Sequence, residues 1–183
     1  KFPKADASWD ITYKIYADGV IKVNNRFVAA NEKTPMIPRI GLRMQMPETF
    51  TTLTYYGRGP EENYRDRRTS QFFGEYSLPI KDMYEPYIRP QENNHRTDIY
   101  WCAFTNKSGV GLLLVADRTF ELNASNHPLE TLDSGDDLHN AAPRTAETDH
   151  RHLTDSKPEK MVDLFIDYRM MGVGGDNSWG ALA

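Results

Sequence analysis

The sequence has one cysteine, no long apolar run and no excess of basic residues. Cys102 has no partner for an internal disulfide, so we expect it to be a small buried apolar side chain. The longest apolar run, residues 110–116, has the length of a strand and falls far short of the roughly eighteen residues of a membrane helix. The first residues also lack the basic-then-apolar layout of a signal peptide. We therefore predict no membrane partner.

The charge balance excludes a second class of partner. The formal net charge is −4 and the basic residues are scattered along the chain. Nucleic-acid binding needs a basic stripe that displaces counterions, so we expect no nucleic-acid partner. The eleven prolines and twelve glycines are also spread out, with no linker, low-complexity segment or repeat. A chain of 183 residues corresponds to roughly one domain, so residues 1–183 are predicted to form a single domain.

The apolar pattern predicts β-strands. Between Trp9 and Val28 most apolar residues fall at every second position on either side of an Asp18-Gly19 turn, which is typical of a hairpin whose second strand begins at Val20 or Ile21. Residues 100–104 and 110–115 flank a second turn, and residues 161–168 form a third strand signal. No window shows helical periodicity with both caps. The pattern predicts an all-β sandwich of long antiparallel strands.

Four loops carry the polar residues that chemistry would need. In the first, Glu61 and Glu62 are a carboxylate pair, but neighbours in an extended chain point apart and cannot flank one glycosidic bond. A solvated turn with ion pairs is the simpler interpretation. In the second, residues 85–96, we expect an ordered loop whose amides and arginines bond to nearby backbone.

The third loop offers a weak metal signal. His150 and His152 would face the same way on a strand, but no cluster of cysteine or histidine supplies the remaining ligands. The acidic run at residues 133–137 lacks the central glycine and terminal glutamate of a calcium loop. We therefore predict no metal site in this chain.

The fourth loop is the glycine-rich stretch before Trp179. Residues 172–175 resemble part of a dinucleotide fingerprint, but Asn177 stands where glycine is needed and no helical pattern follows. The glycines instead permit a sharp loop after a strand that ends at Met170 or Met171. A tryptophan beside short polar side chains is a platform that a sugar ring can stack on. From these residues alone, a core tryptophan remains an equal alternative.

Several segments resemble one family in order along the chain. They are Arg39-Ile40-Gly41-Leu42; Tyr56-Gly57-Arg58-Gly59-Pro60-Glu61-Glu62-Asn63-Tyr64-Arg65-Asp66-Arg67; Met83-Tyr84 with Pro86-Tyr87 and Pro90-Gln91-Glu92-Asn93; His150-Arg151-His152-Leu153; and residues 171–179 with the Gly-Gly-Asp-x-Ser-Trp loop. Together they are similar to the C-terminal domain, also called the small chain or domain 5, of the large β-galactosidases of glycoside hydrolase family 2. The similarity runs from about Trp9 to Trp179.

The resemblance implies a fold and a partner. It implies a large antiparallel supersandwich, related to the aldose mutarotases, that packs against a catalytic TIM barrel of the same parent chain. The family's two catalytic glutamates, which perform retaining hydrolysis of β-galactosides, belong to that barrel. Since a TIM barrel takes about 250 residues, this chain is expected to be one domain of a longer protein, without the last strand or strands of the family's domain. The parent is expected to be a homo-oligomer.

The resemblance also assigns site residues. Trp179 is expected to form an aromatic wall against the bound β-galactoside. The segment Arg39-Ile40-Gly41-Leu42 is expected to lie on a loop near the same pocket, which makes Gly41 a second candidate for contacting the sugar. Asp176, Asn177 and Ser178 are expected to brace the loop. No catalytic residue and no cofactor is expected in this chain, while Mg²⁺ and Na⁺ are implied for the parent enzyme. The residues assign no compartment, whether cytoplasm or periplasm.

Two other functions compete with this interpretation. The first is a mutarotase-like epimerase, in which His95, His150 or His152 and a glutamate exchange protons at a sugar's anomeric centre. The second is a free-standing carbohydrate-binding module in which Trp179 binds sugar unaided.

Overall fold

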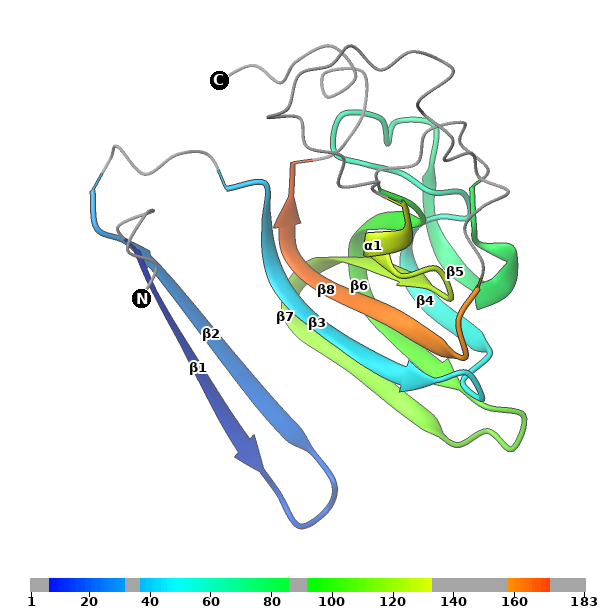
Figure 1. The fold of residues 1–183 in the computed structure, drawn as a ribbon, viewed down its shortest axis with the longest axis horizontal. Helices are drawn as coiled ribbons and strands as arrows, with labels where there is room; N and C mark the ends of the chain where they lie inside the picture. Colours follow the sequence, from blue (N-terminus) through cyan, green and yellow to red (C-terminus); the bar gives the residue numbers. More distant parts are fainter. Residues whose placement is uncertain (1–6, 32–36, 86–91, 133–157, 172–183) are drawn as a thin grey trace. The chain divides into compact units, whose positions relative to one another are not determined.

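The computed structural model describes residues 7–31, 37–85, 92–132 and 158–171 (Figure 1). The chain divides into two compact units, residues 1–37 with residue 183, and residues 38–182. The prediction of a single domain over residues 1–183 stays a prediction.

The first unit contains the hairpin that the sequence predicts. Strand β1 (Ala7–Ile15) pairs antiparallel with β2 (Ile21–Ala29), and Trp9 lies opposite Phe27. In the turn, the Asp18 carboxylate accepts a hydrogen bond from the Val20 amide at 3.0 Å. Gly19 has a φ of +89°, which a residue with a side chain rarely adopts. Of the two predicted starts for the second strand, Ile21 is confirmed.

The second unit is one antiparallel sheet of six strands in the order β3-β8-β7-β6-β4-β5 (Figure 1). The strands are β3 (Arg39–Pro47), β4 (Thr52–Gly59), β5 (Phe72–Pro79), β6 (His95–Thr105), β7 (Gly111–Ser125) and β8 (Met161–Met170). The second predicted hairpin is β6 and β7, and the third predicted strand is β8. All of the predicted strands are therefore confirmed, although β6 and β7 are longer than the apolar pattern indicates.

The core lies on one face of this sheet. Its buried side chains alternate along each strand and include Leu53, Tyr55, Cys102, Phe104, Leu122 and Leu164. The 3₁₀ helix η1 (Ile80–Asp82) adds Ile80, and Met83 follows it. Cys102 is buried and unpaired, as predicted, and burial raises the pKa of its thiol. Besides η1, the described residues contain one helical turn, α1 (Leu129–Leu132), so the all-β antiparallel fold class is confirmed.

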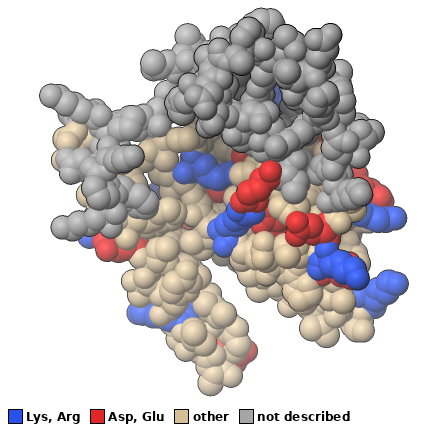
Figure 2. All heavy atoms as spheres, viewed as in Figure 1, with Lys and Arg blue, Asp and Glu red and all other residues tan. Residues whose placement is uncertain are grey.

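The opposite face of the sheet has two different parts. Where β3, β8 and the end of β7 lie together, the face carries charged side chains, several of them buried. Figure 2 shows basic and acidic side chains next to one another in this region rather than a field of one sign. Across β5, β4, β6 and the start of β7, the same face carries exposed apolar side chains. The charged part contains the site residue that the structure describes, Gly41.

Candidate functional site

The structure describes one of the two predicted sugar-contacting residues. The expected loop around Gly41 is wrong, because residues 39–47 pair with β8 and Gly41 lies inside strand β3. Trp179 and its predicted supports Asp176, Asn177 and Ser178 lie outside the described residues. Strand β8 ends at Met170, where the sequence places the end of the strand, and Met171 is the last described residue before the glycine-rich loop. The site is therefore built around Gly41 and the end of β8.

Gly41 is where two strands come unusually close. The register between β3 and β8 shifts between Ile40 and Gly41, and Gly41 then faces Asp167. A Cβ atom on residue 41 would lie 2.6 Å from the carbonyl oxygen of Ile166 and would overlap the Asp167 carboxylate. Since real Cβ atoms do not approach other atoms this closely, the position requires glycine. The close packing of residue 41 against Asp167 therefore explains why this position is glycine.

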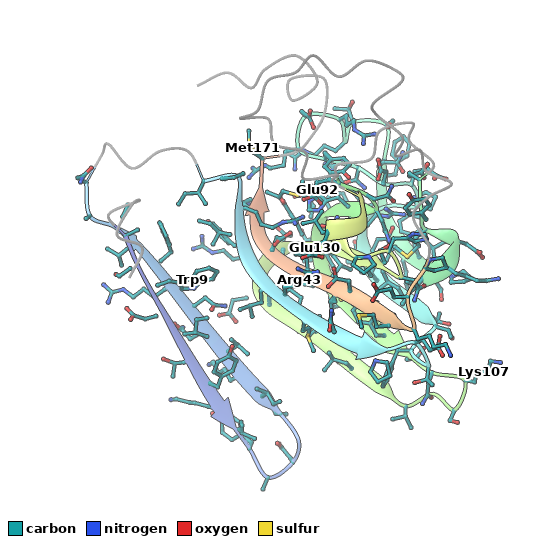
Figure 3. All side chains as sticks on the ribbon, viewed as in Figure 1. Trp9, Arg43, Glu92, Lys107, Glu130 and Met171 are labelled. Atoms are coloured by element: carbon teal, nitrogen blue, oxygen red, sulfur yellow. The ribbon has the colours of Figure 1, made fainter. Side chains whose placement is uncertain are left out.

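Arg39 holds a group of buried polar side chains together beside Gly41. Its guanidinium forms ion pairs with Glu92 and Asp167, each at 3.0 Å. The same group donates a hydrogen bond to the Asn123 side-chain oxygen at 3.1 Å and lies 4.3 Å from the centre of the Phe165 ring. Figure 3 labels Glu92 near the ends of β3 and β8. Arg39 thus connects β7, β8 and the segment that precedes β6.

His95 extends this group into the sheet. One ring nitrogen lies 2.7 Å from the Asn123 side-chain oxygen, and the other lies 3.2 Å from a carboxylate oxygen of Glu121. The Tyr64 ring stacks on the imidazole, with 5.1 Å between ring centres. His95 therefore meets a glutamate, as the mutarotase hypothesis requires. However, the two side chains are only 1% and 2% exposed, so they are enclosed by protein rather than open to a sugar.

Glu121 connects this group to the last residue of β8. Its carboxylate accepts a hydrogen bond from the Met170 backbone amide at 2.8 Å and lies 3.9 Å from the Arg65 guanidinium. The next amide, that of Met171, donates to the Pro38 carbonyl at 2.9 Å. The end of β8 is thus held by the residue that precedes β3 and by a buried carboxylate. We call Arg39, Glu92, His95, Glu121, Asn123 and Asp167 the polar cluster.

Asp167 is the least satisfied member of the polar cluster. Its side chain is completely buried, and neither of its oxygens has a hydrogen-bond partner among the described residues. The Arg39 contact brings opposite charges together, but its geometry is not that of a hydrogen bond. Burial raises the pKa of Asp167 to about 6, although Arg39 and His95 oppose the rise. Burial removes the water that would hydrate the ionised carboxylate, so ionisation of Asp167 is unfavourable at this position.

A second ionic group joins β3 and β8 to α1. The Arg43 guanidinium holds both oxygens of the Asp163 carboxylate, each at 2.8 Å, and also pairs with Glu130 (Figure 3). Hydrogen bonding to Arg43 lowers the pKa of Glu130 to about 2. This arrangement positions elements; none of its members belongs to the predicted site.

The turn at residues 60–67 differs from the sequence expectation. It does contain ion pairs, including Glu62 with Arg67, and its two ends are exposed, but its middle is not solvated. Glu62, Asn63 and Tyr64 are buried, and Glu62 accepts a hydrogen bond from the Asn94 amide at 2.7 Å. The reason is that this turn covers the start of β6, where the Asn63 amide bonds to the His95 carbonyl at 2.8 Å. Glu61 remains exposed, so the two carboxylates do separate as expected.

The other predicted loops are described only in part. In the loop at residues 85–96, the Asn93 side chain bonds to the Glu85 amide at 2.9 Å and to the Glu85 carbonyl at 2.7 Å, which confirms the expected role of its amides. His150, His152 and the acidic run at residues 133–137 lie outside the described residues.

The described residues offer neither a metal-binding cluster nor a membrane-spanning helix. Among them, no group of three or more histidine, cysteine, aspartate or glutamate side chains is arranged to hold a metal ion. The polar cluster therefore does not fit the Mg²⁺ or Na⁺ that the resemblance implies for the parent enzyme. Within the same residues, no helix is long and apolar enough to cross a membrane.

Comparison with known proteins identifies the family. The family described as "Beta galactosidase small chain" matches residues 1–183. The chain belongs to this family. It is 37% identical over 175 residues to a β-galactosidase of Priestia megaterium, a match that covers 96% of this chain and 15% of the relative. It is 35% identical over 145 residues to a β-galactosidase of Leuconostoc mesenteroides, covering 79% of this chain and 12% of the relative.

The chain also matches a small share of a third relative. A β-galactosidase of Vibrio cholerae is 30% identical over 167 residues, covering 91% of this chain and 14% of that protein. The chain thus spans between 12% and 15% of the length of these relatives. The family resemblance read from the motifs is confirmed, and the chain is a small-chain domain of β-galactosidases.

The polar cluster was missed as a group by the sequence interpretation. Arg39 and Glu92 lie in the family motifs and His95 was named only as a candidate proton carrier, whereas Glu121, Asn123 and Asp167 were not singled out. A signal does exist, because Glu121 and Asn123 are two residues apart in one strand and must share a face. What the sequence does not show is which strand lies beside which.

Proposed function

We propose that this chain is the C-terminal domain of a β-galactosidase, where it packs on the catalytic domain of the same parent chain. In this proposal the parent hydrolyses terminal β-galactosides such as lactose with retention, and Trp179 forms an aromatic wall of the sugar pocket. The Mg²⁺ and Na⁺ ions belong to the parent enzyme, outside this chain. The family match over residues 1–183 carries the proposal.

The geometry near Gly41 and at the end of β8 supports the proposed role of the glycine-rich loop that follows β8. A wall residue must be held in place, because a displacement of about 1 Å at a binding site is costly. The Met170 amide bonds to buried Glu121, and the Met171 amide bonds to Pro38. The chain therefore enters the glycine-rich loop from a fixed point, and Gly41 contributes by letting β3 approach Asp167.

The proposal is tested by replacing Trp179 with alanine in the full-length parent. Loss of a stacking aromatic should weaken galactoside binding by about 1 to 3 kcal/mol, by analogy with other alanine truncations of stacking rings. Steady-state kinetics on lactose and on a chromogenic galactoside measure this as a higher KM or a lower kcat/KM. Trp179→Phe is the matched control, since it retains a ring and should keep most of the affinity. Unchanged kinetics for Trp179→Ala would exclude contact with sugar.

The two competing functions give different results with the 183-residue chain alone. A carbohydrate-binding module would bind galactose or lactose in calorimetry, whereas our proposal expects negligible affinity because the rest of the pocket is elsewhere. A mutarotase would accelerate the rotation change of fresh α-galactose in polarimetry. The enclosed position of His95 and Glu121 argues against that activity.

A further inference from the structure

The outer face of the six-stranded sheet carries a continuous apolar surface. Across neighbouring strands, Val115 lies opposite Trp101, and Trp101 lies opposite Tyr56. One step along the strands, Leu113 lies opposite Ala103 in the same way. Directly opposite residues share one face of a sheet, so these side chains all point away from the core that contains Tyr55 and Cys102.

Aromatic rings extend this surface toward β5. The Tyr100 ring centre lies 5.5 Å from that of Tyr56 and 6.1 Å from that of Phe73. The register between β6 and β7 shifts between Ile99 and Trp101, and Tyr100 contacts Tyr56 on the outer face beside Trp101. We call Tyr56, Phe73, Tyr100, Trp101, Leu113 and Val115 the outer apolar face.

The side chains of the outer apolar face are largely exposed among the described residues of the second unit. Val115 is 69% exposed and Leu113 is 61% exposed, and Tyr100, Phe73 and Tyr56 are between 40% and 48% exposed. Side chains of this size, about half exposed, together present on the order of 500 Å² of apolar surface. Patches larger than a few hundred Å² on a folded protein mark a surface that contacts another one.

The strands themselves have the composition of an internal layer. Residues 100–104 and 112–115 are continuous apolar runs, with one set of side chains in the core and the other on the outer apolar face. Strands that face water on one side alternate apolar and polar residues, whereas continuous runs are typical of strands buried on both faces. The paired Arg58 and Asp98 lie at the rim, together with Glu75 opposite Tyr56.

The size of the relatives indicates what covers this face. The matched β-galactosidases are roughly seven times as long as the part that this chain matches. Most of the surface that surrounds the sheet in such a protein therefore comes from chain outside residues 1–183. We propose that the outer apolar face is covered by a segment of the same parent chain outside residues 1–183, which packs on it with an apolar layer of its own. This rests on the proposed function, because it names the surface through which the domain joins its parent.

The test places a photo-cross-linker on the face in the full-length parent. Benzoylphenylalanine replaces Val115 in one variant and Leu113 in a second, so that one misfolded variant does not end the experiment. The reference variant carries the same group at Lys81 in η1, whose side chain is 79% exposed. After illumination, gel mobility separates cross-links within one chain from cross-links between chains, and mass spectrometry identifies the joined peptides.

The expected result is a cross-link within one chain from both positions to a peptide outside residues 1–183, in higher yield than from Lys81. A cross-linked dimer would show that a second copy covers the face, and a peptide within residues 1–183 would show that the chain covers it itself. Either result, or no cross-link at all, overturns the proposal. The Trp179 kinetics do not depend on this outcome, so failure of the docking surface is distinguishable from failure of the sugar wall.

Discussion

Asp167 is a buried carboxylate whose environment disfavours its charged form. Its carboxylate lies in β8 and is completely buried against β3. Gly41 in β3 leaves room for this carboxylate because glycine has no side chain. Arg39 compensates part of the charge. Because the pKa is raised to about 6 by burial, the folded protein keeps a proton on Asp167 at a pH where the unfolded chain, with a value of 3.8, has lost it.

This difference makes a pH prediction with a definite sign. Well below pH 3.8 Asp167 is protonated in both states and has no effect on the free energy of unfolding. As the pH rises from about 4 to 6, the folded state holds more protons than the unfolded state, so this group lowers the free energy of unfolding. A shift of about two pH units corresponds to roughly 3 kcal/mol.

Asp167→Asn should therefore become more stable relative to the unsubstituted chain as the pH rises. Asparagine keeps the shape but does not titrate, and Glu92, His95 and Glu121 remain in both proteins. Urea unfolding of both proteins at pH 4 and pH 7 measures the change in the stability difference. A difference that stays constant across this range would show that Asp167 ionises normally in the folded state.

The β6–β7 hairpin shows how one turn is specified locally. The Asn106 side-chain oxygen accepts hydrogen bonds from the Ser108 amide at 2.9 Å and from the Val110 amide at 3.1 Å. Gly109 has a φ of +78° and nothing within 4 Å of the position that a Cβ would occupy. A substitution there changes backbone strain without introducing a clash.

Gly109→Ala should destabilise the chain by about 1 kcal/mol, because an L-residue is strained in the left-handed region. Gly109→Asn is the matched control and should cost less, since asparagine tolerates this conformation. Thermal unfolding midpoints of the three proteins compare the two substitutions. Equal losses for alanine and asparagine would show that strain is not the cause.

The elements were predictable from the sequence because hairpin signals are local. Turn chemistry at Asp18-Gly19 and at residues 106–109 fixed both hairpins, and alternating apolar residues identified β8. The order β3-β8-β7 was not predictable, because it depends on pairing between segments that are distant in the sequence, with β3 and β8 more than a hundred residues apart. That order creates the polar cluster, so Arg39 and Asp167 meet only in the folded chain. The burial of Glu62 escaped prediction for the same reason.

On the scale of the whole molecule, the chain belongs to the β-galactosidase small-chain family and matches one part of longer relatives. It spans between 12% and 15% of the length of its β-galactosidase relatives. Our proposal assigns both catalytic glutamates to the catalytic domain of the parent, because retaining hydrolysis needs two carboxyl groups about 5 Å apart that face the same bond. Glu61 and Glu62 do not meet this requirement, since one is exposed and the other is buried against Asn94.

The isolated 183-residue chain should therefore hydrolyse no β-galactoside. Incubation with a chromogenic galactoside at high protein concentration measures this, with the full-length parent as the positive control. Turnover above the background of a mock purification would contradict the assignment of the catalytic residues to another domain.

The single cysteine gives this chain an intrinsic reporter of its own opening. Cys102 is fully buried in the middle of the core, opposite Tyr55 in the neighbouring strand, and it is the only thiol in the sequence. A thiol reagent can label it only when β4 and β6 separate from what covers them. The labelling rate thus counts core-opening events in the unsubstituted protein, with no engineered probe. Comparing the labelling rate of Cys102 in the isolated 183-residue chain with its rate in the full-length parent would measure how much the rest of the parent reduces core opening in this sheet.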